Sequence, residues 1–197
     1  MSKRERGISA PLVAAAAVIA IFAAVAVYFF VFQPGGNVMV FADFEAPGTR
    51  PGGSRGIMPD NTLISEADVE GGFSGRALRL TYSFSSGEWC GYWMNFRADE
   101  SGYDVSKYQY IKMWVKGESG NERFKIELKD TSDGASYAYA GAGGTGYVDI
   151  SLGLSQFQKV PWADKGADLS SLKQVNIVFD TEPMRGTLYV DEIRFTG

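Results

Sequence analysis

The chain has 197 residues, of which 45% are hydrophobic, and its net charge at pH 7 is −4. It contains no histidine and a single cysteine, Cys90, which excludes a Cys–His nucleophile pair, an intrachain disulfide and a thiolate metal cluster. The mild acidity also excludes the basic surface of a nucleic-acid-binding protein, and the length suits one domain plus an appendage.

The N-terminal region predicts a membrane span. Residues 1–7 (MSKRERG) form a basic leader, and residues 8–32 contain no charged side chain. A helix of that length rises ~1.5 Å per residue, which is enough to cross a ~30 Å hydrocarbon core. Because the basic residues precede the span, the N-terminus is expected inside. We therefore predict a single-pass protein of the cytoplasmic membrane whose remaining chain is periplasmic or extracellular.

Two other interpretations of this segment stay open. The first is a cleaved signal peptide, although such peptides have a shorter apolar region. The second comes from RERG followed by an uncharged helix beginning ISAPLVA, which resembles the N-terminus of archaeal-type pilins. That resemblance implies cleavage after Gly7 and packing of the helix into a filament. The many alanines of the segment favour such helix-mediated assembly, because they allow close helix–helix approach.

After the span, residues 33–37 (QPGGN) predict a short linker, because Pro34 and the glycines end a helix. From residue 38 to 197, short alternating segments separated by Gly, Asp, Asn and Ser predict an all-β domain. The predicted strands are 38–45, 76–84, 88–97, 108–116, 123–130, 136–140, 146–150, 174–180 and 187–196. Residues 46–62 predict a long loop, and 154–172 an irregular segment with one helical turn. This number of strands predicts a two-sheet β-sandwich of the jelly-roll type.

The phase of the alternation predicts which side of each strand is buried, because successive side chains point to opposite faces. The predicted core sets are Leu78, Leu80, Tyr82 and Phe84; Ile111, Met113 and Val115; Phe124, Ile126 and Leu128; and Val175, Ile177 and Phe179. In SSGEWCGYWMNF (85–96), the same rule assigns Cys90, Tyr92, Met94 and Phe96 to the core. The thiol of Cys90 is therefore interpreted as a packing group.

The opposite register of the same stretch predicts a binding face. Trp89, Trp93 and Asn95 face outward, and we expect them on one face with Tyr110 and Trp114. The outward register also holds Lys112, Lys116, Lys125, Glu127, Lys129, Asn176 and Asp180. Flat aromatic rings stack on the apolar faces of sugars, while amides and carboxylates bond to hydroxyls. The alternative is that a loop, such as 46–62, covers these rings.

Seven segments in chain order carry a family resemblance: VFADFE (40–45), GGFSGRALRLTYSF (71–84), SGEWCGYWMNF (86–96), DVSKYQYIKMWVKG (104–117), FKIELKD (124–130), DLSSLKQVNIVFDT (168–181) and GTLYVDEIRF (186–195). Together they resemble a galactose-binding-like jelly roll. The nearest groups are the carbohydrate-binding modules of families 11 and 30, and the complex I intermediate-associated protein family shares the layout.

The resemblance implies a non-catalytic sandwich that binds glucan-like chains on a concave sheet. The positions that could correspond to the family's binding residues are Trp89, Trp93, Asn95, Tyr110 and Trp114. Such modules often hold one structural calcium ion between their first and last strands. The acidic pairs Asp43/Glu45 and Asp191/Glu192 supply the carboxylate oxygens that Ca²⁺ prefers, with Asp43, Glu45 and Asp191 as the expected ligands. The alternative is that these acids are surface residues at strand ends.

Two functions are consistent with these observations. One is a membrane-anchored, extracytoplasmic binding module that recognises carbohydrate. The other is a structural or accessory subunit of a larger membrane complex or pilin-like filament, in which the sandwich docks on protein partners. An enzyme is not expected, because nothing in the sequence pairs two carboxylates across a cleft as glycoside hydrolysis requires.

Overall fold

The computed structural model describes residues 37–59 and 62–197. Residues 37–197 form a unit with its own core, distinct from residues 1–36. The predicted leader (1–7), membrane helix (8–32) and all of the linker except Asn37 lie outside the described residues. Within the described part of the chain, no helix is both long and apolar enough to cross a membrane.

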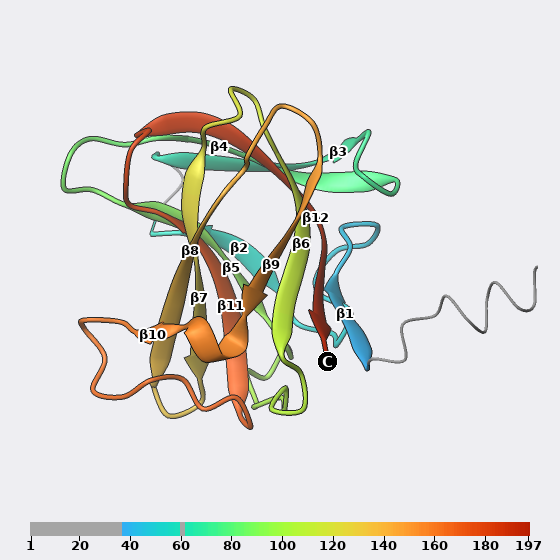
Figure 1. The fold of residues 1–197 in the computed structure, drawn as a ribbon, viewed down its shortest axis with the longest axis vertical. Helices are drawn as coiled ribbons and strands as arrows, with labels where there is room; N and C mark the ends of the chain where they lie inside the picture. Colours follow the sequence, from blue (N-terminus) through green and yellow to red (C-terminus); the bar gives the residue numbers. More distant parts are fainter. Residues whose placement is uncertain (1–36, 60–61) are drawn as a thin grey trace, which may run out of the picture. The chain divides into compact units, whose positions relative to one another are not determined.

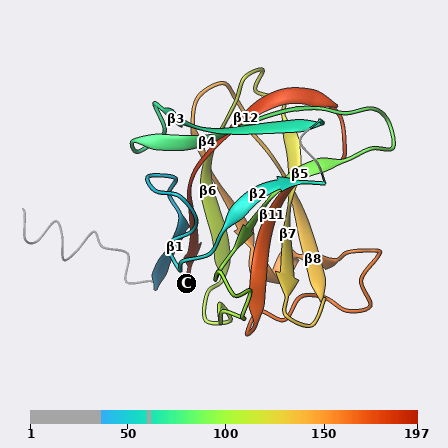
Figure 2. The same ribbon diagram turned by 180° about the vertical axis from the view of Figure 1, so that it is seen from behind.

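The described residues form two antiparallel sheets, each of six strands, packed face to face (Figures 1 and 2). The first sheet has the order β3 (Ile64–Glu70), β4 (Arg76–Ser83), β12 (Arg185–Thr196), β6 (Tyr110–Gly117) and β9 (Val148–Gly153), with β1 (Val38–Ala42) also paired to β12. The second has the order β10 (Gln158–Lys159), β8 (Ala135–Gly141), β7 (Arg123–Asp130), β11 (Leu172–Phe179), β5 (Cys90–Asn95) and β2 (Arg55–Met58). The predicted all-β jelly-roll sandwich is confirmed.

Each of the nine predicted strands is present, with ends shifted by a few residues. The predicted helical turn is also present, as the short 3-10 helix η1 (Leu154–Gln156). The prediction that 46–62 is entirely loop is wrong, because β2 lies within it and forms an edge of the second sheet. The short strand RGIM escaped prediction because it has no apolar alternation, and β3 (ISEADVE) because acidic residues interrupt its pattern.

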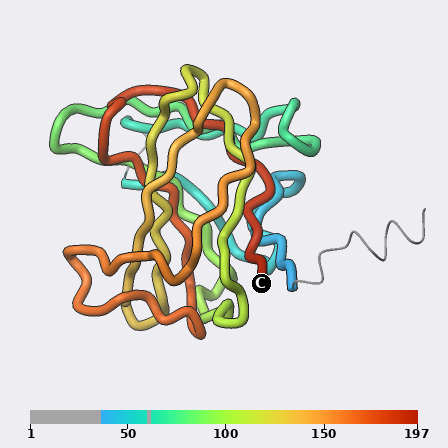
Figure 3. Tube along the Cα trace, viewed as in Figure 1, coloured from blue at the N-terminus to red at the C-terminus, as the bar shows by residue number. Residues whose placement is uncertain are grey.

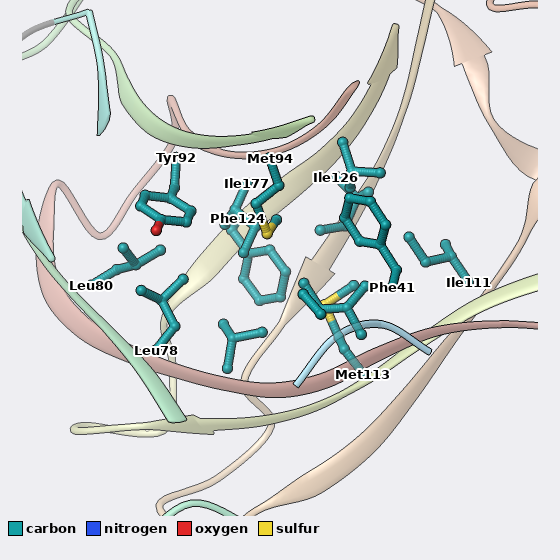
Figure 4. Close-up of a cluster of buried hydrophobic side chains, with 14 of the residues drawn as sticks. Phe41, Leu78, Leu80, Tyr92, Met94, Ile111, Met113, Phe124, Ile126 and Ile177 are labelled. Atoms are coloured by element: carbon teal, nitrogen blue, oxygen red, sulfur yellow. The ribbon is translucent and has the colours of Figure 1, made fainter. Parts of the chain in front are cut away.

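The predicted core is confirmed throughout. The inward side chains of both sheets meet between them (Figure 4), and Cys90, Tyr92, Met94 and Phe96 are at most 1% exposed. Aromatic stacking links the layers: the ring of Tyr82 in β4 lies 3.9 Å from that of Phe179 in β11, centroid to centroid. Burial of one large apolar side chain contributes ~1.5–3 kcal/mol. A core of this extent therefore holds the outward side chains of each sheet in fixed positions.

Candidate functional site

The outward face of the second sheet is built from three rows of side chains set by strand register. The first row runs across the sheet through Tyr139, Lys125, Val178, Gly91 and Met58. The second runs through Tyr137, Glu127, Asn176, Trp93 and Gly56. The third contains Ala135, Lys129, Gln174 and Asn95. Small residues at the centre of the first row leave room above the sheet between larger side chains.

A groove of about 510 Å³ lies on this face, within the range of small-ligand sites. Its lining comprises Met58, Gly87, Glu88, Trp89, Lys125, Glu127, Lys129, Trp162, Val178 and Asp180. Two exposed indoles belong to it: Trp89 is 44% exposed and Trp162 is 58% exposed. The groove therefore combines open aromatic surface with charged hydrogen-bonding groups.

The turn before β5 positions Trp89. Gly87 adopts a left-handed backbone conformation with φ of 86°, which glycine tolerates without strain. Glu88 closes the turn, because its backbone N–H donates to the Ser85 carbonyl at 3.0 Å and its carboxylate accepts the Ser85 N–H at 2.7 Å. The strand begins at Cys90, whose burial leaves the preceding indole at the groove.

Trp162 lies outside the regular strands and is positioned by the packing of its neighbours in the chain. It lies between Val160 and Ala163, which are both buried against Ala135 of β8. The ammonium of Lys129 lies 5.1 Å from its ring centroid, close enough for a cation–π contact. The neighbouring buried residues fix the backbone, so the indole remains presented to solvent.

The charged groups on the floor of the groove are paired with one another. Lys125 Nζ lies 2.8 Å from Asp180 Oδ2 and 3.6 Å from Glu127 Oε2, and Lys129 Nζ lies 3.9 Å from Glu127 Oε1. Burial opposes the charge on Lys125, but the hydrogen bond and charge of Asp180, together with the charge of Glu127, outweigh it and raise the pKa of Lys125. Because both lysines face carboxylates, the floor has little net charge to attract an ionised ligand.

Two acceptor atoms on this face are buried and lack a hydrogen-bond partner among the described residues: Asp180 Oδ1 and Asn176 Oδ1. A buried acceptor without a donor is unfavourable by about 1–3 kcal/mol. Asp180 lines the groove, so this buried oxygen lies just below its surface.

Of the five predicted binding residues, only Trp89 lines the groove. Trp93 and Asn95 lie on the same face, but Trp93 is partly buried and Asn95 is buried. The indole Nε1 of Trp93 donates to the Ile57 carbonyl of β2 at 3.2 Å. Asn95 is 3% exposed, and its Oδ1 accepts from Gln174 Nε2 at 2.9 Å. Strand β2, in the second part of the 46–62 segment, thus covers part of this face, which was the alternative to an open face.

The prediction that Tyr110 and Trp114 share this face is wrong. Both belong to β6, which lies in the first sheet, so they point away from the sandwich on its opposite side. Lys112 and Lys116 of the same strand go with them. Strand alternation separates inward from outward positions, but it does not say to which sheet a strand belongs.

Sequence reasoning missed Trp162, Tyr137 and Tyr139 as residues of the second-sheet face. Tyr137 and Tyr139 alternate on β8 in outward register, and this alternation was a usable signal. The signal for Trp162 was weaker, since VPWAD falls in an irregular stretch where no strand phase applies. A tryptophan that follows proline in a loop would have been the one indication.

The acidic residues predicted to bind calcium divide into two groups. Glu45 and Asp191 both approach the turn at residues 71–76: Glu45 Oε1 accepts the Arg76 N–H at 2.7 Å, and Asp191 Oδ2 accepts the Ser74 N–H at 2.9 Å. Asp43 does not join them, because it accepts from Arg50 Nε at 2.6 Å. In the described part of the chain, no three His, Cys, Asp or Glu side chains are gathered as a metal site.

Asp191 is nevertheless an unusual carboxylate. It is fully buried, and burial raises its pKa, assisted by the charges of Glu192 and Glu45 and opposed by two backbone N–H donors. No cationic side chain of the described residues forms an ion pair with it. Glu45 and Asp191 thus lie beside the same turn, and calcium binding by them stays a prediction.

Comparisons with known proteins bear on this arrangement. The family described as "Carbohydrate binding domain 30" matches residues 51–197. Among solved structures, the chain is similar to a family 11 carbohydrate-binding module from Clostridium thermocellum in complex with a β-1,3-1,4-mixed-linked tetrasaccharide, with a TM-score of 0.65, 17% identity and coverage of 80% of this chain and 94% of that one. It is also similar to a family 30 module of a cellulosomal cellulase of Clostridium thermocellum, with a TM-score of 0.57, 17% identity and coverage of 72% and 86%.

The fold also occurs within larger enzymes. An exo-β-agarase matches with a TM-score of 0.57 and 16% identity over 81% of this chain, but only 24% of that chain is covered. No curated protein sequence matches. The resemblance to families 11 and 30 is confirmed, while the resemblances to complex I intermediate-associated proteins and to pilins stay predictions. The matched region spans most of the chain and includes the whole groove, and the chain belongs to the carbohydrate binding domain 30 family.

Proposed function

We propose that this protein is a non-catalytic module that binds a neutral, β-linked glucan chain in the groove of the second sheet. The observation that carries the proposal is the pair of exposed indoles, Trp89 and Trp162, on a groove whose floor consists of paired lysines and carboxylates. Family membership supports carbohydrate as the ligand class, and such families are binding domains rather than catalysts. The mixed-linked tetrasaccharide bound by the family 11 neighbour suggests the linkage to test first.

The groove favours a hydroxyl-rich ligand over a charged one. An indole face can cover the apolar C–H face of a pyranose, which contributes hydrophobic contact with defined orientation. The carboxylates that line the groove can accept from hydroxyls, and the lysines can donate to ring or hydroxyl oxygens. A ligand with its own charge would meet both signs at close range, so attraction and repulsion would largely offset each other.

The test is isothermal titration of the full chain in detergent with soluble mixed-linked β-1,3-1,4-glucan oligosaccharides. We expect saturable binding that is lost in the double variant Trp89→Ala/Trp162→Ala. Tyr110→Ala is the matched control, because it removes an exposed aromatic ring from the other sheet. Absence of binding to neutral glucans, or an equal loss in the control, would refute the proposal.

We also propose that residues 8–32 anchor the module in the cytoplasmic membrane, with the sandwich outside. The support is the uncharged length of the segment and the basic leader before it. Membranes from producing cells should retain the full chain after alkaline carbonate washing, and added protease should reach the sandwich in spheroplasts. Release of the chain by washing, or a mature N-terminus beyond residue 32, would show that no anchor is present. Cleavage after Gly7 would point to the pilin-like alternative.

A further inference from the structure

A second aromatic surface lies on the opposite side of the sandwich from the groove. We call it the first-sheet face and define it by the outward residues of β1, β12 and β6 with the ring that packs on them: Val38, Val40, Arg194, Tyr110, Lys112, Trp114, Lys116 and Phe73. Val38 is 54% exposed and Phe73 is 47% exposed. The ring of Phe73 stacks on Trp114 with centroids 3.6 Å apart, which builds an aromatic patch. Two grooves of the described structure, of about 630 and 510 Å³, are lined by other residues.

Two lysines of this face are not paired with carboxylates of the described residues. Within the described residues, Lys112 and Lys116 have no carboxylate at ion-pair distance. Each lies over an aromatic ring instead: Lys112 Nζ is 5.7 Å from the Tyr110 centroid, and Lys116 Nζ is 4.2 Å from that of Tyr189.

Arg194 adds a third cation near the centre of the face. Its charge is balanced by Asp149 at 2.8 Å and Glu192 at 3.9 Å, and its guanidinium lies 5.9 Å from the Trp114 ring. In register, Val40 of β1, Arg194 of β12 and Lys112 of β6 form one continuous row across three strands. The apolar and cationic groups are therefore interleaved.

The position of β1 links this face to the predicted membrane span. The linker of residues 33–37 reaches at most about 17 Å when fully extended. If residues 8–32 cross the bilayer, as proposed above, β1 must begin within that distance of the lipid. Val38, the first residue of β1, lies on the first-sheet face. The short linker thus brings this face within reach of the membrane.

We propose that the first-sheet face docks on a membrane surface rich in anionic phospholipid. Tyrosine and tryptophan are favoured at the membrane–water interface, and lysines are attracted to anionic headgroups. An exposed aromatic patch flanked by lysines suits an extended surface of anionic headgroups. The inference builds on the proposed anchor, but it concerns different residues from the glucan groove.

The experiment uses the sandwich alone, residues 37–197. This unit has its own core. The match to a solved family 11 module covers 94% of that module, which therefore consists of little besides the same fold. Co-sedimentation is measured with vesicles of mixed phosphatidylglycerol and phosphatidylcholine, and with phosphatidylcholine alone. We expect binding only to the anionic vesicles, weakened at 1 M salt, where the Debye length falls to about 3 Å.

The double variant Lys112→Gln/Lys116→Gln should bind about 25-fold more weakly. The factor is about fivefold per lysine, which corresponds to ~1 kcal/mol for each basic residue at an anionic surface. The matched control is Lys159→Gln/Lys165→Gln, which removes the same charge from the exposed segment beside the second sheet. The control pair should bind as the wild type does.

Several results would overturn the proposal: no binding to anionic vesicles, equal binding to both vesicle types, or the same loss in the control pair. So would a soluble acidic polysaccharide, such as polygalacturonate, that binds through Lys112 and Lys116 while vesicles do not. Glucan titrations of the same variants separate this proposal from the previous one. The variant Lys112→Gln/Lys116→Gln should keep glucan binding, and Trp89→Ala/Trp162→Ala should keep vesicle binding.

Discussion

Removal of the Trp162 indole is the sharpest test of the groove, because its effect can be worked from exposure. A tryptophan side chain offers about 250 Å² of surface. With 58% of Trp162 exposed, about 145 Å² is open, and a sugar stacked on one face would cover about half of this. At ~25 cal/mol per Å², that contact contributes ~1.8 kcal/mol, or about a 20-fold change in Kd.

The same reasoning for Trp89, which is 44% exposed, gives ~1.4 kcal/mol and about a tenfold change. Titration calorimetry with a mixed-linked tetrasaccharide would measure both values directly. Thermal unfolding serves as the fold control, since an exposed indole contributes little to the core and the midpoint should hardly change. The reasoning is refuted if Trp162→Ala binds within a factor of two of the wild type while remaining folded, or if Trp89→Ala proves the more damaging change.

Three further predictions concern stability and reactivity. The Cys90 thiol should not react with a water-soluble disulfide reagent at pH 9 until the protein unfolds, because it is fully buried and burial raises its pKa to about 12; rapid labelling of the native protein would contradict this. Asp180→Asn should lower the free energy of unfolding by about 2 kcal/mol in urea titrations, since it leaves the Lys125 ammonium with a weaker partner. The raised pKa of Lys125 means that this difference is full from neutral pH up to about pH 10 and disappears as the pH rises through the folded-state value; a difference that grows at high pH would contradict the assignment. Calcium at a hundredfold excess over its Kd should stabilise the protein by ~2.7 kcal/mol, which raises Tm by about 5–10 °C, and Asp191→Asn should abolish the shift; an unchanged Tm with calcium or chelator would remove the site.

The sequence contains enough information to predict the fold class and the buried side of each predicted strand. Every residue assigned to the core by alternation is buried, from Leu78 on β4 to Phe179 on β11. This works because burial imposes a period of two on any strand with one face in the core. The rule is local, so it needs no knowledge of which strands are neighbours.

The binding face could be predicted only in part, because it depends on pairings between distant segments. Trp93 and Trp114 have the same outward register, yet β5 pairs with β11 and β6 pairs with β12, which places the two rings on opposite sides. Trp162 lies outside any strand, so its contribution depends on how Val160 and Ala163 pack against β8. Long-range pairing and loop packing are tertiary properties that a strand-by-strand pattern does not encode.

The pairing of β1 with β12 decides how the sandwich responds to mechanical load. Val38 pairs with Thr196, and the Gly197 N–H donates to the Asn37 carbonyl at 3.0 Å, so the two ends of the sandwich lie side by side (Figure 3). Tension between these ends would pull the ladder apart one hydrogen bond at a time, starting at its outermost pair. The strand β1 would peel away first under low force, and β12 would follow only when its bonds to β4 and β6 break. The second sheet, which carries the groove, lies outside the load path between the two ends, so its strands keep their pairing while β1 detaches.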